Sequence, residues 1–169
     1  MNQKHKNLYL FLLSSILLSF LSCHHNPEAI NVSFHNFGPN GMMPDEEYIF
    51  SPFENLDYDS LIISKYDISL IIRYSDKCRI KQLPLKIESS SFNFDTIYNS
   101  EISAILFDDK NKNSGKGGLG SYETIIPFRD NESFDKGLSL AISTPEKNAQ
   151  GIIALGVICN PVPIDFNNK

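Results

Sequence analysis

The densest group of residues with potential chemistry lies between Asp108 and Gly120. Asp109, Asn111 and Asn113 occupy the first, third and fifth positions of a series that resembles the calcium loop of an EF-hand. Such a loop requires glycine at position six and a bidentate glutamate at position twelve. Ser114 and Gly120 stand at these positions. A looser calcium site through the three side chains therefore stays open as the alternative to a plain turn, and we otherwise expect no metal and no cofactor.

The same stretch satisfies the spacing G-x-G-x-x-G at Gly115, Gly117 and Gly120. A phosphate cradle of this kind needs a helix after the glycines, so that backbone N–H groups face the anion. Residues 121–128 instead alternate in polarity and contain Pro127, which predicts a strand. The glycines then serve a polar connection between two strands, where they permit positive φ.

Nucleophilic catalysis by serine or cysteine generally requires a nearby base, most often histidine. After residue 22 the chain contains only His24, His25 and His35. The first two begin a proline-containing linker, and the third lies in a predicted surface strand. The acidic runs 45–47 and 108–109 are expected to be solvated. We therefore expect no enzyme and no catalytic residue.

The first 22 residues are typical of a secretory signal. Lys4 and Lys6 precede an apolar run from Leu8 to Leu21, which is shorter than the roughly 20 residues of a membrane span. Residues 20–23 read Phe-Leu-Ser-Cys and resemble a bacterial lipobox. We therefore expect cleavage before Cys23, with a diacylglycerol on its thiol and a third acyl chain on its amine.

Several acyl chains anchor a protein far more firmly than one. The sequence thus predicts a lipoprotein of the bacterial cell envelope, at the periplasmic face or in the outer membrane. Residues 23–30 would form a tether, and residues 31–169 a single domain. The 147 residues that remain after cleavage (169 − 22) suffice for one core.

Cleavage removes two lysines, so 13 basic residues (15 − 2) face 20 acidic ones, a balance of −7. An acidic body disfavours nucleic acid, because binding depends on phosphate neutralisation by lysine and arginine. Cys78 and Cys159 could form a disulfide in an oxidising compartment. Two buried free thiols are the alternative. Pairing requires Cα atoms within about 7 Å, so the sequence leaves both open.

The body alternates apolar and polar residues with a period of two. In residues 66–74 the tyrosines, isoleucines and leucine at even positions share one face, while Asp67, Ser69 and Arg73 lie on the other. Residues 151–159 are apolar on both faces, which predicts a central strand. We expect seven to nine strands in an all-β, antiparallel β-sandwich, Ig-like or jelly-roll-like, with a barrel as the main alternative. Pro84 and Pro127 should mark edges or bulges.

A family resemblance rests on four features between residues 83 and 128. These are the short strand Leu83–Ile87, the step Asp95-Thr96, a strand ending in Leu106-x-Asp108, and the glycine turn before Tyr122. Together they resemble the gliding-motility lipoprotein H (GldH) family of Bacteroidota, over roughly residues 45–160. The tryptophan that this family usually carries in the glycine turn is absent here.

The resemblance implies a non-enzymatic lipoprotein with protein partners in the cell envelope, associated with gliding and the linked type IX secretion apparatus. Residues 59–61 and 95–97 also resemble the O-glycan acceptor triplets of that phylum. A different class is a surface lipoprotein that binds a glycan or other ligand through loop tyrosines and phenylalanines. Most of these aromatic residues fall on the core-facing positions, which favours the interaction subunit.

Overall fold

The computed structural model describes residues 31–54, 65–90, 98–133 and 137–162. These ranges contain nine strands and no helix, so they hold no membrane-spanning helix. The predicted signal peptide, Cys23, His24 and His25 in the tether, and both glycan triplets lie outside the described residues.

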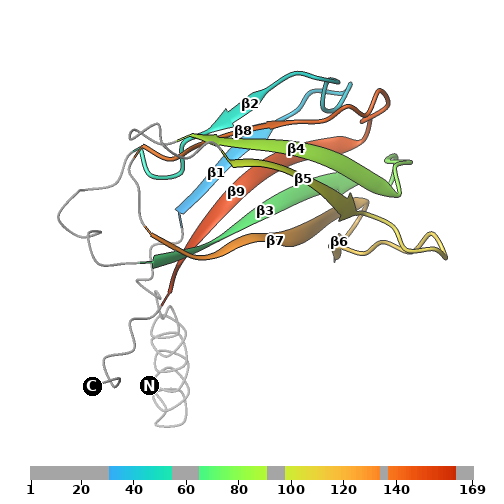
Figure 1. Ribbon diagram of the computed structural model, residues 1–169. Helices are drawn as coiled ribbons and strands as arrows, with labels where there is room; N and C mark the ends of the chain where they lie inside the picture. Colours follow the sequence, from blue (N-terminus) through green and yellow to red (C-terminus); the bar gives the residue numbers. More distant parts are fainter. Residues whose placement is uncertain (1–30, 55–64, 91–97, 134–136, 163–169) are drawn as a thin grey trace, which may run out of the picture.

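All the strands are antiparallel and form two sheets (Figure 1). The five-stranded sheet has the order β1-β9-β3-β7-β6 and the four-stranded sheet the order β2-β8-β4-β5. The strands are β1 (Asn31–Asn36), β2 (Tyr48–Phe50), β3 (Lys65–Ser75), β4 (Gln82–Ser90), β5 (Tyr98–Ile105), β6 (Lys116–Gly118), β7 (Ser121–Ser133), β8 (Ser139–Ser143) and β9 (Ile152–Val162). The predicted all-β sandwich is confirmed.

The pairing gives the sandwich its topology. The first strand pairs with the last, β2 pairs with β8, β3 with β7, and β4 with β5. Successive pairs alternate between the two sheets, so one long antiparallel ribbon is wound around the core. This winding is a jelly roll, one of the two predicted variants. Strand β6 is an addition within the connection from β5 to β7.

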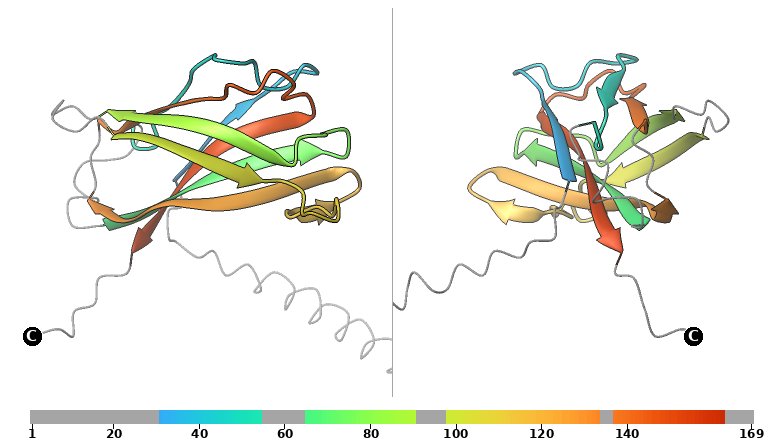
Figure 2. Two further views of the ribbon diagram at one scale, coloured as in Figure 1. Left: turned by 45° about the vertical axis from the view of Figure 1, so that its right-hand side comes forward. Right: turned by 90° about the vertical axis from the view of Figure 1, so that its left-hand side faces the viewer.

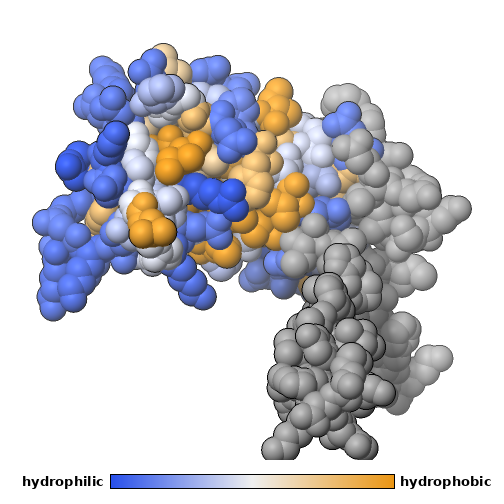
Figure 3. Space-filling view, turned by 180° about the vertical axis from the view of Figure 1, so that it is seen from behind, coloured by the Kyte–Doolittle hydropathy of each residue, from blue (hydrophilic) through white to orange (hydrophobic). Residues whose placement is uncertain are grey.

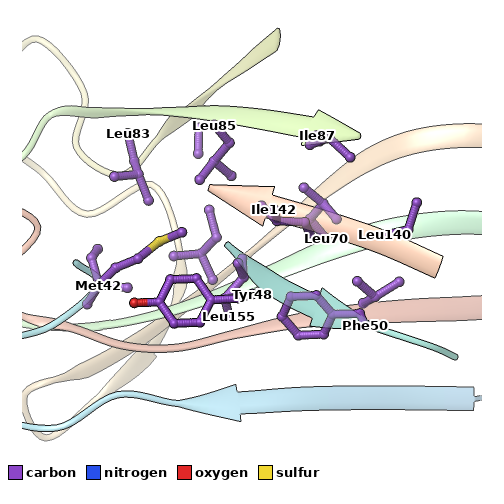
Figure 4. Close-up of a cluster of buried hydrophobic side chains, with 14 of the residues drawn as sticks. Met42, Tyr48, Phe50, Leu70, Leu83, Leu85, Ile87, Leu140, Ile142 and Leu155 are labelled. Carbon is purple, nitrogen blue, oxygen red and sulfur yellow. The ribbon is translucent and has the colours of Figure 1, made fainter. Parts of the chain in front are cut away.

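The core lies between the sheets and is built from the alternating side chains that the sequence predicts (Figure 4). Leu70 of β3, Leu85 of β4 and Ile142 of β8 belong to one cluster, and all three side chains are at most 1% exposed. Each fully buried side chain of this size contributes roughly 1.5–3 kcal/mol relative to an exposed one. These segments therefore form strands because alternation with a period of two puts their apolar side chains on one buried face.

Both predicted prolines lie where a ladder hydrogen bond is not needed. Strand β8 pairs only with Lys86–Ser90 of β4, so Pro84 lies beyond its end. Strand β6 pairs only with Ser121–Glu123 of β7, so Pro127 lies on an open edge, next to a register shift in the pairing with β3. The prediction of an edge or bulge is confirmed at Pro127, whereas Pro84 lies in an inner strand, beyond the end of the neighbouring β8.

The two ends of the sandwich differ in what they carry. Asn31 lies opposite Cys159, so the described chain begins and ends at the same end of the sandwich. The connections 37–47, 76–81, 106–120 and 144–151 lie at the other end, which we call the loop end (Figure 2). Strand β3 has 11 residues, so the two ends are about 35 Å apart.

Candidate interaction surface

The two cysteines of the domain are buried and unpaired. Cys78 lies in the connection from β3 to β4 and packs against Gly151, where an added Cβ would be 2.5 Å from the Cys78 nitrogen. Cys159 follows Gly151 by eight residues, most of them in β9, which corresponds to about 25 Å along an extended strand. A disulfide requires Cα atoms within about 7 Å. Of the two arrangements that the sequence left open, the structure therefore has two buried free thiols and no disulfide between Cys78 and Cys159.

Burial also determines the chemistry of these thiols. It raises the pKa of Cys159 from its ordinary value of 9.0 to about 12. Burial raises the pKa of Cys78 as well, against a lowering hydrogen bond from the Ile80 backbone and the charge of Arg79. Because the thiolate is the nucleophilic form, both cysteines act as small apolar core residues.

The acidic start of the long connection is held by its own hydrogen bonds. Asp108 Oδ1 accepts from the backbone N–H groups of Lys110 and Lys112, each at 2.8 Å. Asp109 and Asn111 are exposed, while Asn113 is partly buried and bridges to Phe107. The described residues contain no cluster of three His, Cys, Asp or Glu side chains that could hold a metal. The calcium candidate stays a prediction, and the turn has a physical explanation without it.

The glycine pattern joins β6 to β7 by a tight turn with no helix, as the sequence predicts. The connection is nevertheless not a simple solvent-facing tip. The Gly115 N–H donates to the Tyr74 hydroxyl at 3.0 Å, and that hydroxyl donates to the Leu106 carbonyl at 2.8 Å. Tyr74 is fully buried, and burial raises its pKa. The connection is therefore anchored to the core at Gly115, while Lys116–Gly118 stay exposed.

The third histidine lies on an exposed part of β1, as predicted. His35 stacks on Phe37 and Tyr48, with ring centroids 5.1 and 4.8 Å away. The acidic run 45–47 is exposed, and Glu46 accepts a hydrogen bond from the Tyr48 hydroxyl at 2.9 Å. Nearby, a depression of about 530 Å³ opens at the loop end, lined in part by Phe37, Lys77 and Gln150.

An apolar surface lies on the outer face of the five-stranded sheet, away from the core. Residues opposite one another in neighbouring strands share a face. The pairing places Val32, Ile158, Ser69 and Pro127 in one row, and Phe34, Gly156, Ile71 and Ile125 in the next. We call the six larger apolar residues of these rows the outer apolar band: Val32, Phe34, Ile71, Ile125, Pro127 and Ile158.

The exposure of the band is uneven. Val32 is 44% exposed and Ile125 is 55% exposed, whereas Ile71 between them is 4% exposed. The Phe34 ring lies across Gly156, where an added Cβ would be 2.5 Å from the ring. The Arg73 guanidinium covers this ring at 4.3 Å from its centroid.

Polar residues border the band on both sides. Towards the loop end, the next row contains Asn36, Arg73, Glu123 and Lys116, and Arg73 Nε donates to Glu123 Oε2 at 2.7 Å. Towards the other end, Asp67 accepts a hydrogen bond from the Asn131 N–H at 2.8 Å. Figure 3 looks onto this face and shows hydrophobic residues over its middle and hydrophilic residues at the loop end. An apolar centre with a polar rim is the usual anatomy of a protein interface.

This band was not predicted from the sequence, because the strands other than residues 151–159 were each expected to have one core face and one solvent face. The signal was present as apolar residues on the solvent side. Ile71 shares the face of Ser69 and Arg73, and the segment 151–159 is apolar on both faces. In a central strand, apolar residues on both faces indicate that the outer face of the sheet is itself apolar or covered.

No protein-family model matches the chain, and no curated protein matches its sequence. Among solved structures, it is similar to the Nora virus structure at 12% identity, with a TM-score of 0.34 over 83% of this chain and 59% of that chain. It is also similar to the Tomato aspermy virus structure at 8% identity, with a TM-score of 0.36 over 96% and 98% of the two chains. A third is the Tobacco streak virus coat protein dimer, at 9% identity and a TM-score of 0.31 over 85% and 94%. Likenesses this distant carry no argument about function.

Proposed function

We propose that the protein is a lipid-anchored lipoprotein of the bacterial cell envelope and acts as a non-enzymatic interaction subunit. In this proposal the outer apolar band binds a protein partner. The observation that carries it is the exposure of Val32 and Ile125, 44% and 55%, on one continuous face with a polar rim. Contiguous exposed apolar patches on a monomer are typical of interaction sites.

The chemistry of the band favours a protein over a glycan. The exposed side chains are aliphatic, and the one aromatic ring in the band, Phe34, is covered by Arg73. Sugar binding usually uses an open aromatic ring as a platform. An aliphatic surface of this kind is better matched by apolar side chains of another protein, because both surfaces then lose contact with water.

The predicted lipid on Cys23 supplies the location. A tether of residues 23–30 leads directly to Asn31 and spans at most about 28 Å when extended. A membrane anchor would therefore lie beside the end of the sandwich where β1 begins, with the loop end pointing away. The resemblance to the GldH family supports the gliding machinery and the linked type IX secretion apparatus as the setting.

A lysine in the band tests this proposal. Ile125→Lys places a charge in the band, and Ile49→Lys is the matched control, since Ile49 is 69% exposed on β2 of the other sheet. Both variants are expressed in the native host, and partners are captured from crosslinked membranes. We expect Ile125→Lys to reduce partner recovery at least about tenfold, a loss of roughly 1.4 kcal/mol, while Ile49→Lys changes little.

Equal recovery with both variants would contradict the proposal. Binding on a glycan array without any captured protein would instead favour the ligand-binding alternative. The depression lined by Phe37, Lys77 and Gln150 is then the place to mutate.

A further inference from the structure

The edge strands of the sandwich differ in how they are protected against pairing with other chains. An edge strand presents a row of unpaired backbone N–H and C=O groups, which native proteins usually shorten, cover or interrupt with proline or lysine. Strand β2 has only three residues. Strand β7 is covered by β6 over Ser121–Glu123, and Pro127 interrupts the rest of its edge.

Strand β5 is neither short nor interrupted by proline or lysine. It is eight residues long, with the sequence YNSEISAI, and contains no proline, lysine or arginine. Within the described residues it pairs with β4 on one side and has no strand partner on the other. Among the described residues, the edge of β5 is therefore open along its full length.

Apolar side chains beside this edge are incompletely covered. Ile102 of β5, together with Ile126 and Phe128 of β7, packs against the core but stays partly exposed. We call these three residues the β5 flank. The two strands face each other across it, because Arg129 Nη2 of β7 contacts Ser100 Oγ of β5 at 3.4 Å.

We propose that β5 binds an extended segment of another protein as an additional strand. The segment's backbone would pair with the open edge, and its alternate apolar side chains would cover the β5 flank. On the other face of the strand, Glu101 lies opposite Lys86 of β4, so a lysine or arginine of the segment would complete the row of charges.

A second copy of β5 is a poorer occupant. Antiparallel self-pairing would bring the two Glu101 side chains close together, in a chain whose formal net charge is already −5. Like charges on neighbouring strands destabilise the pairing. The inference goes beyond the proposed function, because β5 belongs to the four-stranded sheet and the outer apolar band to the other. A negative result for the β5 edge would leave the proposal for the outer apolar band unchanged, and the reverse also holds.

The test uses the full chain in detergent and fluorescent synthetic nonapeptides in which valine alternates with lysine and threonine. Two further peptides carry N-methyl groups on alternate amides, one set on the odd and one on the even positions. Because alternate N–H groups of a strand point towards its neighbour, one methylated peptide should bind like the parent and the other should not. Binding is followed by fluorescence anisotropy.

Two chain variants localise the binding. Ile102→Lys places a charge on the β5 flank, and Ile105→Lys is the control on the opposite face of the same strand, where Ile105 is 53% exposed. We expect Ile102→Lys to weaken binding at least about tenfold and Ile105→Lys to leave it nearly unchanged. If Ile102→Lys fails to fold, the difference in binding between the two N-methylated peptides still tests the proposal. The proposal is overturned by no saturable binding up to about 1 mM peptide, by equal effects of two folded variants, or by equal binding of the methylated peptides.

Discussion

At the level of single residues, close backbone contact is the main constraint at the loop end. Gly151 has φ +88° and lies against the backbone of Cys78, where an added Cβ would be 2.5 Å from the nitrogen. Gly118, by contrast, has no atom within 4 Å of an added Cβ. A side chain is therefore excluded at Gly151 by close contact and has open space at Gly118, although both glycines lie in connections at the same end of the sandwich.

Gly151→Ala should lower the free energy of unfolding by about 2–4 kcal/mol, because a left-handed conformation costs an L-residue about 1–2 kcal/mol and overpacking adds about 1–3 kcal/mol. Gly118→Ala is the matched control and should change it by less than about 0.5 kcal/mol. Urea unfolding monitored by circular dichroism measures both. Similar values for the two variants would show that Gly151 does not contact Cys78 in solution.

The buried thiols predict a dependence of stability on pH. Burial raises the pKa of Cys159 from 9.0 to about 12, so the folded protein binds the proton more tightly than the unfolded chain does. The contribution of Cys159 is fully present below about pH 9 and is lost as the pH rises towards about 12. Cys159→Val should flatten the fall of the urea midpoint over this range, and an unchanged slope would contradict the assignment.

At the level of elements, period-two alternation was sufficient to predict strands. Residues 66–74 and 83–87 alternate cleanly and became β3 and β4, and the doubly apolar segment 151–159 became β9 between two neighbours. The pairing was not predictable, because alternation sets which side chains face the core but not which strand lies alongside. The residue types of β1 and β9 do not indicate that the first strand pairs with the last.

The candidate surfaces show the same limit. Ile71 and Ile125 are visible in the sequence as apolar residues on a solvent-facing side, but only the register puts them in one row. The separation of Cys78 from Cys159 likewise follows from the path of β9, which the residue types do not encode. The hydrogen bonds of the turn were not predictable either, since the calcium-like spacing begins at Asp109 while Asp108 accepts the backbone N–H groups.

This difference between neighbouring aspartates is testable. Asp108→Ala removes the acceptor of the Lys110 and Lys112 N–H groups, so these amides should exchange with solvent at least about tenfold faster, equivalent to roughly 1.4 kcal/mol. Asp109→Ala is the control and should leave both amides unchanged. Amide exchange followed by NMR measures this, and faster exchange in the Asp109 variant alone would favour the EF-hand-like interpretation over the plain turn.

At the level of the whole molecule, a jelly roll carries a predicted lipid anchor and two proposed binding surfaces, the outer apolar band and the β5 edge. Cys23→Ala should remove the anchor, because the acyl chains that hold the protein on the bilayer would then be absent. The variant is expected to partition at least about tenfold more into the aqueous phase of a detergent phase separation, while Cys78→Ala stays in the detergent phase. Unchanged partitioning of the Cys23 variant would contradict the lipoprotein prediction.

Photocrosslinking in living cells can detect the proposed contact between the outer apolar band and a protein of the cell envelope. A photoreactive amino acid replaces Ile125 in one strain of the native host and Ile49 in another. Illumination should join the Ile125 position to one defined protein and leave the Ile49 position without that product. Crosslinks from Ile49 to the same protein, or no protein crosslink from Ile125, would contradict the claim.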